Sequence, residues 1–245
     1  MARKWILITG GSRGIGQALV THLLPEWNVV FTGRSEEGIA RTQMFAQTLS
    51  TGNWVKGVRC DGKDDARVEH IAGTLIDEFG APTAIIHNAG MTNDALHIHQ
   101  RAQDWREILD NNLVSVLNWN RQLLPAMMMQ GHGSVVLMSS VTALKGNSGQ
   151  TAYAASKAAM IGVAHSLARE VGRFGIRVNC LAPGLIEGEM IEAIPETKLK
   201  ALRQNIPLRR LGSAQDVAQM AAFLIGEGSS YLTGQILVLD GGLSA

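Results

Sequence analysis

The sequence has only two cysteines, Cys60 and Cys180, among its 245 residues, which excludes a fold held together by several disulfides. Charge is scarce as well, at 18% of residues against a typical value of about 25%. The net charge of +1 gives no support to binding of nucleic acid or a membrane surface through bulk charge. No apolar run approaches the roughly 18 residues of a membrane span, and the first one is too short for a signal peptide. We therefore expect a cytoplasmic protein that binds neither nucleic acid nor membrane.

Hydrophobic residues make up 46% of the chain, which excludes a disordered protein. Short apolar runs, typical of buried strands, alternate with longer windows of helical pattern. The expected strands are 4–9, 27–32, 54–59, 83–87, 133–138, 176–181 and 235–239, and the expected helices are 14–24, 36–49, 64–79, 101–129, 152–173 and 214–226. This alternation predicts an α/β fold, a single doubly wound parallel sheet of Rossmann type with about seven strands and helices on both faces. We expect one domain over 1–245, with a lid-like insertion near 184–212.

A glycine-rich loop, TGGSRGIG at 9–16, follows the first expected strand and opens the first expected helix. Glycines at this place allow a tight turn, a close approach of the backbone to a pyrophosphate, and close packing of helix on strand. The start of the helix also offers free N–H groups and a positive dipole end to phosphates. The alternative is an ordinary glycine turn. The pattern favours a nucleotide site formed by Gly10, Ser12, Arg13, Gly14, Ile15 and Gly16.

The same loop also matches G-x-S-x-G, the pattern around the nucleophile of α/β-hydrolases. Those enzymes need an acid and then a histidine later in the chain. Asp216 could supply the acid, but no histidine follows His165. The order of the triad therefore fails, and the sequence disfavours a hydrolase.

The residues after the second expected strand indicate which nucleotide binds. NAD-binding folds place an acid about 20 residues beyond the loop, where it binds the ribose 2′-OH. Here the strand ends without an acid and Arg34 follows it, while Arg13 lies within the glycine loop. Two guanidinium groups favour a 2′-phosphate and therefore NADPH, and the alternative is a pair of solvated surface arginines.

Ser140, Tyr153 and Lys157 form the candidate catalytic group. Ser140 follows the strand expected at 133–138, and Tyr153 and Lys157 are four residues apart on one face of the next expected helix. An ammonium near a phenol stabilises the phenolate, so we expect Lys157 to lower the pKa of Tyr153 from about 10. Such a tyrosine suits proton transfer between a carbonyl and an alcohol. Taken alone the spacing is a weak signal, because both residue types are common at solvated helix rims.

Together these motifs resemble the short-chain dehydrogenase/reductase family over essentially the whole chain. In order, the matching motifs are the loop at 9–16, Asp61, Asn88-Ala89-Gly90, Asn112, Ser140, Tyr153, Lys157 and Pro183-Gly184. Within the family, the stretches 88–96, 146–153, 183–187 and 206–212 are most similar to the bacterial 3-oxoacyl-acyl-carrier-protein reductases.

The resemblance implies a role for each matching position. Tyr153 would protonate the reduced oxygen, Lys157 would hold the nicotinamide ribose, and Ser140 would orient the keto group. Asn112 would anchor a water that passes protons towards Lys157. The alternative interpretation of Asn112 is a side chain inside a helix that is hydrogen-bonded to the backbone. The cofactor would also be held by Asp61 at the adenine, by Asn88, Ala89 and Gly90 beside it, and by Pro183, Gly184 and Ile186 at the carboxamide. The alternative interpretation of Asp61 is an ordinary turn residue at the end of a strand.

Some positions depart from the family pattern. Gly188 stands where these reductases usually carry Thr, which removes a hydroxyl contact to the cofactor. His87 stands where Asn is common, and we interpret it as a packing residue. His97 and His99 have no acidic or Cys ligands with them, so we expect no metal site.

The resemblance also implies partners, an acidic acyl carrier protein and a homotetramer formed through 101–129 and 152–173. Carrier docking usually uses basic residues beside the mouth of the active site, at positions that are Gly131 and Phe174 here. Arg173, Arg209 and Arg210 are the basic residues that could replace them.

The sequence therefore predicts an NADPH-dependent reductase of 3-oxoacyl thioesters bound to acyl carrier protein. Fatty-acid synthesis and type II polyketide or polyene synthesis both remain open as the pathway. The alternatives are a dehydrogenase of coenzyme A thioesters or free keto and alcohol substrates, and a cofactor-binding regulator without catalysis.

Overall fold

A central parallel sheet organises the protein. The computed structural model describes residues 4–49, 52–188 and 196–245. Within them the strands pair in the order β3-β2-β1-β4-β5-β6-β7, and every pairing is parallel. The strands are β1 (Trp5–Thr9), β2 (Asn28–Gly33), β3 (Val55–Arg59), β4 (Ala84–His87), β5 (Gly133–Met138), β6 (Ile176–Pro183) and β7 (Ile236–Leu239). The order runs outwards on both sides of the β1–β4 pair, so the predicted doubly wound sheet is confirmed.

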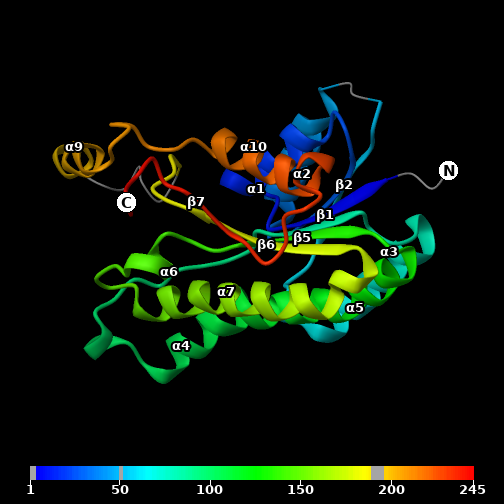
Figure 1. The fold of residues 1–245 in the computed structure, drawn as a ribbon, viewed down its shortest axis with the longest axis horizontal. Coiled ribbons are helices and arrows are strands. Elements are labelled where there is room, and N and C mark those ends of the chain that lie inside the picture. Colours follow the sequence, from blue (N-terminus) through cyan, green and yellow to red (C-terminus); the bar gives the residue numbers. More distant parts are fainter. Residues whose placement is uncertain (1–3, 50–51, 189–195) are drawn as a thin grey trace.

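Helices cover both faces of this sheet, as Figure 1 shows. One face carries α1 (Gly14–Leu23), α2 (Glu36–Gln47) and α10 (Ala214–Ile225), and the other carries α3 (Asp65–Phe79), α5 (Ser115–Gln130) and α7 (Thr151–Val171). The other α-helices among the described residues are α4 (Ala102–Leu109), α6 (Thr142–Lys145) and α9 (Glu196–Asn205), with short 3-10 turns at His97–His99, Gly172–Phe174 and Glu227–Ser229. Among the described residues, no helix is both long and apolar enough to cross a bilayer.

The core lies in two layers, one on each face of the sheet. In β1, Trp5 and Leu7 pack into the layer under α3, α5 and α7, whereas Ile6 and Ile8 pack into the layer under α1 and α10. All four side chains are fully buried. Successive side chains of a strand point to opposite faces, so a strand covered on both faces must be apolar throughout. This is why β1 and the first residues of β4 read as continuous hydrophobic runs, whereas the edge strand β3 carries Lys56 and Arg59.

The helix expected at 101–129 is divided in the structure. α4 ends at Leu109, a π-helical turn spans Asp110–Val114, and α5 begins at Ser115. A π-helical turn inserts one extra residue into the helical ladder and is frequent at functional sites. Sequence periodicity does not distinguish this turn from a continuous helix, and the candidate residue Asn112 lies inside it.

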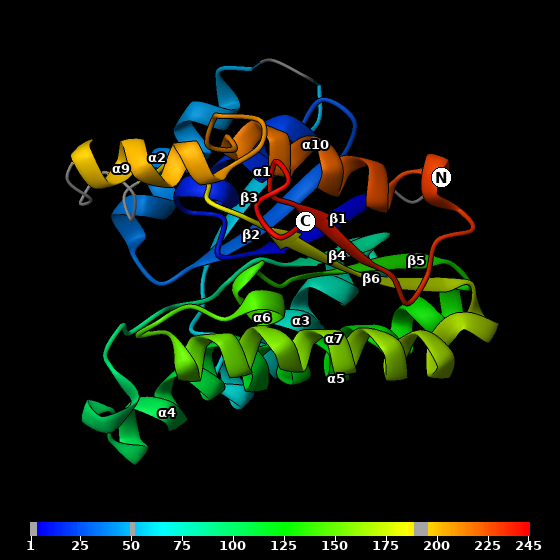
Figure 2. The same cartoon turned by 60° about the vertical axis from the view of Figure 1, so that its left-hand side comes forward.

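The insertion expected near 184–212 contains α9, which is not part of either core layer. Figures 1 and 2 show α9 projecting from the carboxyl ends of the strands, on the side of α1 and α10. Leu199, Ile206 and Leu211 form a small apolar cluster of their own. Ile186 and Gly212 pair in an isolated parallel bridge that closes the base of the insertion. Residues 189–195 of the predicted lid lie outside the described residues.

Candidate active site

The loops after β1 and β4 meet where the strand order changes direction. The side-chain amide of Asn88 donates to the carbonyl of Gly10 at 3.0 Å, and the amide of Ala89 donates to the hydroxyl of Thr9 at 3.1 Å. The two loops approach so closely that a Cβ on Gly10 would lie 2.8 Å from the Cα of Ala89. In open α/β sheets this position is where ligands bind. The structure therefore places Gly10, Asn88 and Ala89 together, as the sequence predicts.

The glycines of the loop serve two different purposes. A Cβ on Gly16 would lie 1.9 Å from the carbonyl oxygen of Gly10, so only glycine lets α1 pack this close to the loop. Gly14 has a φ of +52°, a conformation that favours glycine, and a Cβ on it would meet nothing within 4 Å. The open space beside Gly14 and the free N–H groups at the start of α1 fit a phosphate-bearing cofactor.

The other loop residues and the end of β2 surround the same place. Ser12 packs against the last residue of β2, since a Cβ on Gly33 would lie 2.9 Å from the hydroxyl of Ser12. Arg13 and Arg34 are both exposed, and Ile15 is half-buried against the α1 side of the core. The amide of Cys60 donates to the carbonyl of Gly33 at 2.9 Å, so the segment after β3, which contains Asp61, lies beside the end of β2. Glu36, the first acid of α2, is paired with Arg59 at 2.8 Å.

Lys157 is buried between α7 and β5. Its ammonium donates to the carbonyl of Met138 at 2.8 Å, and its own carbonyl accepts from the hydroxyl of Ser139 at 2.8 Å. The Nζ atom lies 5.8 Å from the centre of the Tyr153 ring. A side-chain hydrogen bond joins Tyr153 to Ser140, whose hydroxyl also accepts from the amide of Thr142 at 3.1 Å. The three predicted catalytic side chains are thus in one cluster.

Asn112 is almost completely buried beside this cluster, and its side chain fixes the loop after β4. Its Oδ1 accepts from the amide of Met91 at 2.8 Å, and its Nδ2 donates to the carbonyl of Met91 at 2.9 Å. Nδ2 also donates to the hydroxyl of Ser156 at 2.9 Å, and Ser156 donates in turn to the carbonyl of Tyr153 at 2.7 Å. A Cβ on Gly90 would lie 3.1 Å from the Nζ of Lys157 and 3.3 Å from the Oδ1 of Asn112, which explains the glycine there.

The electrostatics of the cluster correct one expectation from the sequence. Burial lowers the pKa of Lys157 from 10.5 to about 8. Burial also raises the pKa of Tyr153, and the hydrogen bond with Ser140 opposes this rise. The sequence predicted a pKa of Tyr153 below its usual value of about 10, and for the protein alone this is wrong. The physical reason is that burial removes the water that would solvate the phenolate. The ammonium of Lys157 donates to the carbonyl of Met138 and lies 5.8 Å from the centre of the Tyr153 ring. Tyr153 is therefore a neutral phenol at neutral pH, the form that donates a proton.

The loop after β6 completes this edge of the sheet. Pro183 ends β6, and the amide of Gly184 donates to the carbonyl of Leu239 in β7 at 2.9 Å. A Cβ on Gly184 would lie 2.6 Å from the Cβ of Asp240, so a larger residue does not fit. Ile186 lies beyond it in the bridge to Gly212. Gly188 has a φ of +149°, a conformation that L side chains rarely adopt, so a threonine there would be strained.

The interpretation of His87 has a clear outcome. His87 is a packing residue, as expected: it is 3% exposed, and its Nε2 lies 2.8 Å from the Oδ1 of Asn120 in α5. Burial lowers its pKa to about 4, so it is neutral at physiological pH. Among the described residues there is no group of three or more His, Cys, Asp or Glu side chains that could hold a metal ion.

The expected location of the carrier-docking positions is wrong for a single chain. Gly131 and Phe174 precede β5 and β6, and the amide of Gly133 donates to the carbonyl of Gly175 at 3.2 Å. They therefore lie at the amino ends of the strands, whereas Ser140 follows the carboxyl end of β5. The guanidinium of Arg173 lies 4.7 Å from the ring of Phe174, at that same remote end.

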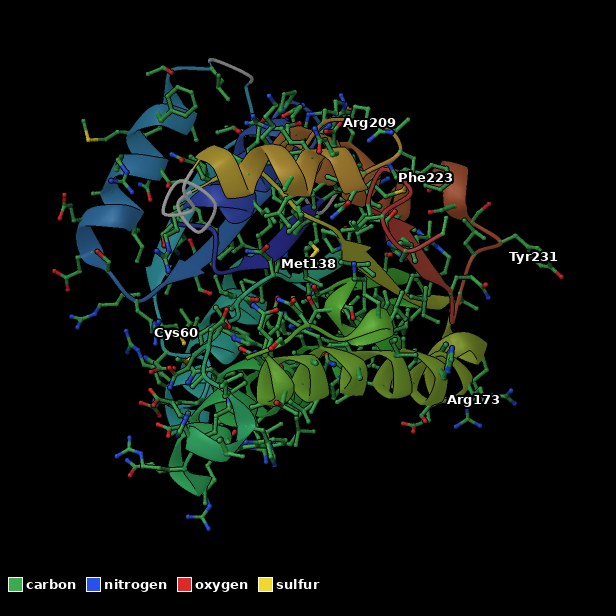
Figure 3. All side chains as sticks on the ribbon, turned by 90° about the vertical axis from the view of Figure 1, so that its left-hand side faces the viewer. Cys60, Met138, Arg173, Arg209, Phe223 and Tyr231 are labelled. Atoms are coloured by element: carbon green, nitrogen blue, oxygen red, sulfur yellow. The ribbon has the colours of Figure 1, made fainter. Side chains whose placement is uncertain are left out.

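Arg209 and Arg210 follow α9 and are the basic candidates nearer the strand carboxyl ends. Figure 3 shows Arg209 on the α9 side and Arg173 beside α7, with Met138 near the centre. Arg210 is engaged by Asp216 at 2.7 Å, and the guanidinium of Arg209 donates to the carbonyl of Gln204.

Comparisons with known proteins agree with this geometry. A family model described as enoyl-(acyl carrier protein) reductase matches residues 10–244. The chain belongs to the short-chain dehydrogenase/reductase family. Within that family it is 37% identical to the 3-oxoacyl-(acyl-carrier-protein) reductase FabG of Escherichia coli over 241 residues, 98% of this chain and 97% of that one. FabG of Thermotoga maritima is also 37% identical, over 243 residues, with 98% of this chain and 97% of that protein covered.

The short-chain dehydrogenase/reductase fold is also found in solved structures similar to this one. A crystal structure of levodione reductase matches with a TM-score of 0.93 and 29% sequence identity, covering 98% of this chain and 96% of that one. The chain is thus an oxidoreductase of this family, and its curated relatives carry the name of a ketoreductase.

Sequence reasoning missed several residues that support the site. The hydroxyl of Ser139 donates to the carbonyl of Lys157, and the hydroxyl of Ser156 accepts from the side chain of Asn112. A hydrogen bond between the side chains of Asp94 and Gln150 joins the loop after β4 to the loop before α7. Ser156 lies between Tyr153 and Lys157 in the sequence, and this position already indicates that it is near the site. Asp94 and Gln150 are 56 residues apart in the sequence, and nothing in the spacing connects them.

Proposed function

We propose that the chain catalyses the NADPH-dependent reduction of a 3-oxoacyl thioester, carried by acyl carrier protein, to the 3-hydroxyacyl thioester in fatty-acid synthesis. The observation that carries this proposal is the cluster of Ser140, Tyr153 and Lys157 at the carboxyl edge of the sheet, beside the glycine loop. The names of the curated relatives support the substrate. The cluster suits a ketone because it offers a neutral proton donor next to a hydroxyl that can orient an oxygen.

The residues around the β1–β4 junction fit NADPH. The loop Gly10, Ser12, Arg13, Gly14, Ile15 and Gly16 would hold the pyrophosphate, and Asp61, Asn88, Ala89 and Gly90 would line the adenosine and ribose side. Pro183, Gly184 and Ile186 would support the carboxamide. When bound, NADPH supplies the hydride that reduces the keto carbon. The preference for NADPH over NADH rests on Arg13 and Arg34, which are exposed at the corner where the 2′-phosphate would lie.

The chain's own residues handle the proton. The hydroxyl of Ser140 orients the keto oxygen, and the phenol of Tyr153 donates its proton to that oxygen as it becomes an alkoxide. Lys157 then stands close to the phenolate and stabilises it, since its ammonium lies 5.8 Å from the ring centre. Asn112 fixes Met91 and Ser156, and through them it holds the glycine-containing loop and the first turns of α7. Its place in a π-helical turn suits the role of anchoring a proton-relay water.

The same proposal includes an acyl carrier protein as the partner that carries the substrate, assembly as a homotetramer, and a location in the cytoplasm. Arg173 lies at the amino ends of the strands and Ser140 at their carboxyl ends. A carrier protein docked beside the site of the same chain would therefore contact Arg209 and the α9 region instead. The tetramer would use the α5 and α7 side, where Val114 and Leu117 are exposed apolar residues. A dedicated polyketide or polyene pathway would present the same thioester chemistry to the same site.

A second function is favoured by one specific likeness. The similar solved structure is named for levodione, and this supports a keto substrate that is not carried by a protein. A panel of substrates separates the two functions: 3-oxoacyl chains on acyl carrier protein, on coenzyme A and on N-acetylcysteamine, together with an enoyl thioester. We expect the highest kcat/KM for the carrier-bound 3-oxoacyl chain. Equal values for the carrier-bound chain and the N-acetylcysteamine mimic would remove the carrier from the proposal, and preference for the enoyl thioester would refute keto reduction.

A further inference from the structure

The loop after β4 and the loop that leads into α7 are joined by a side-chain hydrogen bond to a carboxylate. Asp94 lies in the loop after β4, and its Oδ2 accepts from the side-chain amide of Gln150 at 2.8 Å. Its other carboxylate oxygen accepts from the hydroxyl of Thr92 in the same loop. A backbone bond lies next to this contact, from the amide of Ala95 to the carbonyl of Gly149 at 2.9 Å. The loop after β4 is thereby fastened to the loop that leads into α7.

Gln150 stands directly before the helix that carries Tyr153. It is the N-cap residue of α7, and its backbone carbonyl accepts from the amide of Ala154 at 2.7 Å. Its Oε1 accepts from the side-chain amide of Asn147 at 3.0 Å, so both ends of its side chain are held. Tyr153 lies three residues later, in the first turn of α7. A shift of Gln150 would therefore move the turn that positions the phenol.

We propose that Asp94 is a positioning residue, which through its hydrogen bond to Gln150 fixes the first turn of α7 and the hydroxyl of Tyr153 for proton transfer. This proposal rests on the proposed function, in which Tyr153 is the proton donor. It gives a role to a residue that does not touch the reacting groups and that the sequence singled out only as part of the stretch 88–96.

The charge of Asp94 supports the same role. The groups that act on Tyr153 come from three places: Lys157 on its own helix, Ser140 at the end of β5, and Asp94 from the loop after β4. Behind Lys157 stands the neutral thiol of Cys180 in β6, whose pKa burial raises. Burial raises the pKa of Tyr153, Ser140 opposes the rise, and the negative charge of Asp94 adds to it. Asp94 thus favours the neutral phenol, because a nearby negative charge disfavours the phenolate.

Three variants separate the hydrogen bond from the charge, and a fourth is their control. Asp94→Ala removes both, Gln150→Ala removes the bond and keeps the charge, and Asp94→Asn keeps the shape and removes the charge. Asp77→Asn, at an exposed position of α3, is the matched control for the loss of a carboxylate. We expect Asp94→Ala and Gln150→Ala each to lower kcat roughly 3- to 10-fold, the range for loss of one partly exposed hydrogen bond, with NADPH affinity unchanged. The double variant with both alanines should lose no more than the worse single variant, because the two residues act as one unit.

The phenol can also be observed without any substrate. The chain has only two tyrosines, and Tyr231 is fully exposed, so Tyr231→Phe leaves Tyr153 as the single phenol that titrates. In that background, ultraviolet absorbance of the phenolate measures the pKa of Tyr153. Asp94→Asn should lower it relative to the parent, and Asp77→Asn should leave it unchanged. The midpoint of thermal unfolding is recorded for every variant.

The outcomes decide the proposal. Losses of Asp94→Ala and Gln150→Ala that multiply in the double variant, or a phenol pKa that Asp94→Asn leaves in place, would overturn it. If the wild-type protein reduces none of the 3-oxoacyl thioesters, the proposed function fails. The tyrosine titration still tests the role of Asp94 in that case, so the two failures are distinguishable.

Discussion

Lys157 is held in the site at a cost to stability, and replacing it by methionine tests this. Lys157 is 4% exposed, and burial lowers its pKa from 10.5 to about 8. One pKa unit corresponds to about 1.4 kcal/mol, so the charged form destabilises the folded protein by about 3 kcal/mol at pH 7. Lys157→Met fills a similar space without charge, but it leaves the carbonyl of Met138 without its donor, which costs about 1 to 3 kcal/mol. At pH 7 the variant should therefore be as stable as the wild type or more stable.

The pH dependence isolates the charge from the lost hydrogen bond. Between pH 8 and pH 10.5 the unfolded chain keeps the proton on Lys157 while the folded chain has released it. Stability then rises with pH, because the unfolded state binds more protons. Below pH 8 both states are protonated, and the penalty is constant. In Lys157→Met this contribution is absent, so the stability of the wild type minus that of the variant should increase across this window by about 3 kcal/mol.

Urea unfolding of both proteins without cofactor, from pH 7 to pH 10.5, provides the measurement. Other groups titrate in the same range, but they are common to both proteins and cancel in the difference. The variant should also lose its turnover, because in the proposed mechanism Lys157 stabilises the phenolate of Tyr153. An apolar residue at this position would thus raise stability and lower activity. A difference that stays flat with pH would refute the reasoning, because it would mean that Lys157 keeps its ordinary pKa in the folded state.

Three further predictions concern the site and the loop. Tyr153→Phe should abolish most turnover and leave NADPH binding intact, because only the proton donor is lost; near-normal kcat together with intact binding would rule out Tyr153 as the donor. Arg34→Ala should weaken NADPH binding roughly 10- to 100-fold, the loss of a charge-assisted bond of about 1.5 to 3 kcal/mol, and leave NADH binding unchanged; titration of both cofactors checks this, and equal losses would exclude a contact with the 2′-phosphate. Gly16→Ala should destabilise the protein and abolish cofactor binding, since its Cβ would lie 1.9 Å from the carbonyl oxygen of Gly10; circular dichroism melting and cofactor titration test it, with Gly73→Ala in α3, where a Cβ meets nothing within 4 Å, as the control.

The layout of the sheet could be predicted because the strands are short and the central ones are largely apolar. β1 illustrates this: Trp5, Ile6, Leu7 and Ile8 are buried on alternating faces, and only a strand covered on both sides needs apolar residues at every position. The positions of Ser140, Tyr153 and Lys157 followed from helical spacing and from the end of a strand. These are local properties, and the chain carries them wherever it folds.

What the sequence by itself determined was the fold class, the glycine loop and the candidate catalytic side chains. Only the tertiary structure decided their environment. The pKa of Tyr153 depends on how much solvent the packed loops exclude, and the carbonyl of Met138, which holds Lys157, comes from another element. The bond between Asp94 and Gln150 and the remote place of Arg173 likewise depend on which loops the sheet brings to the same end. Burial and proximity are set by the whole fold, and no spacing along the chain encodes them.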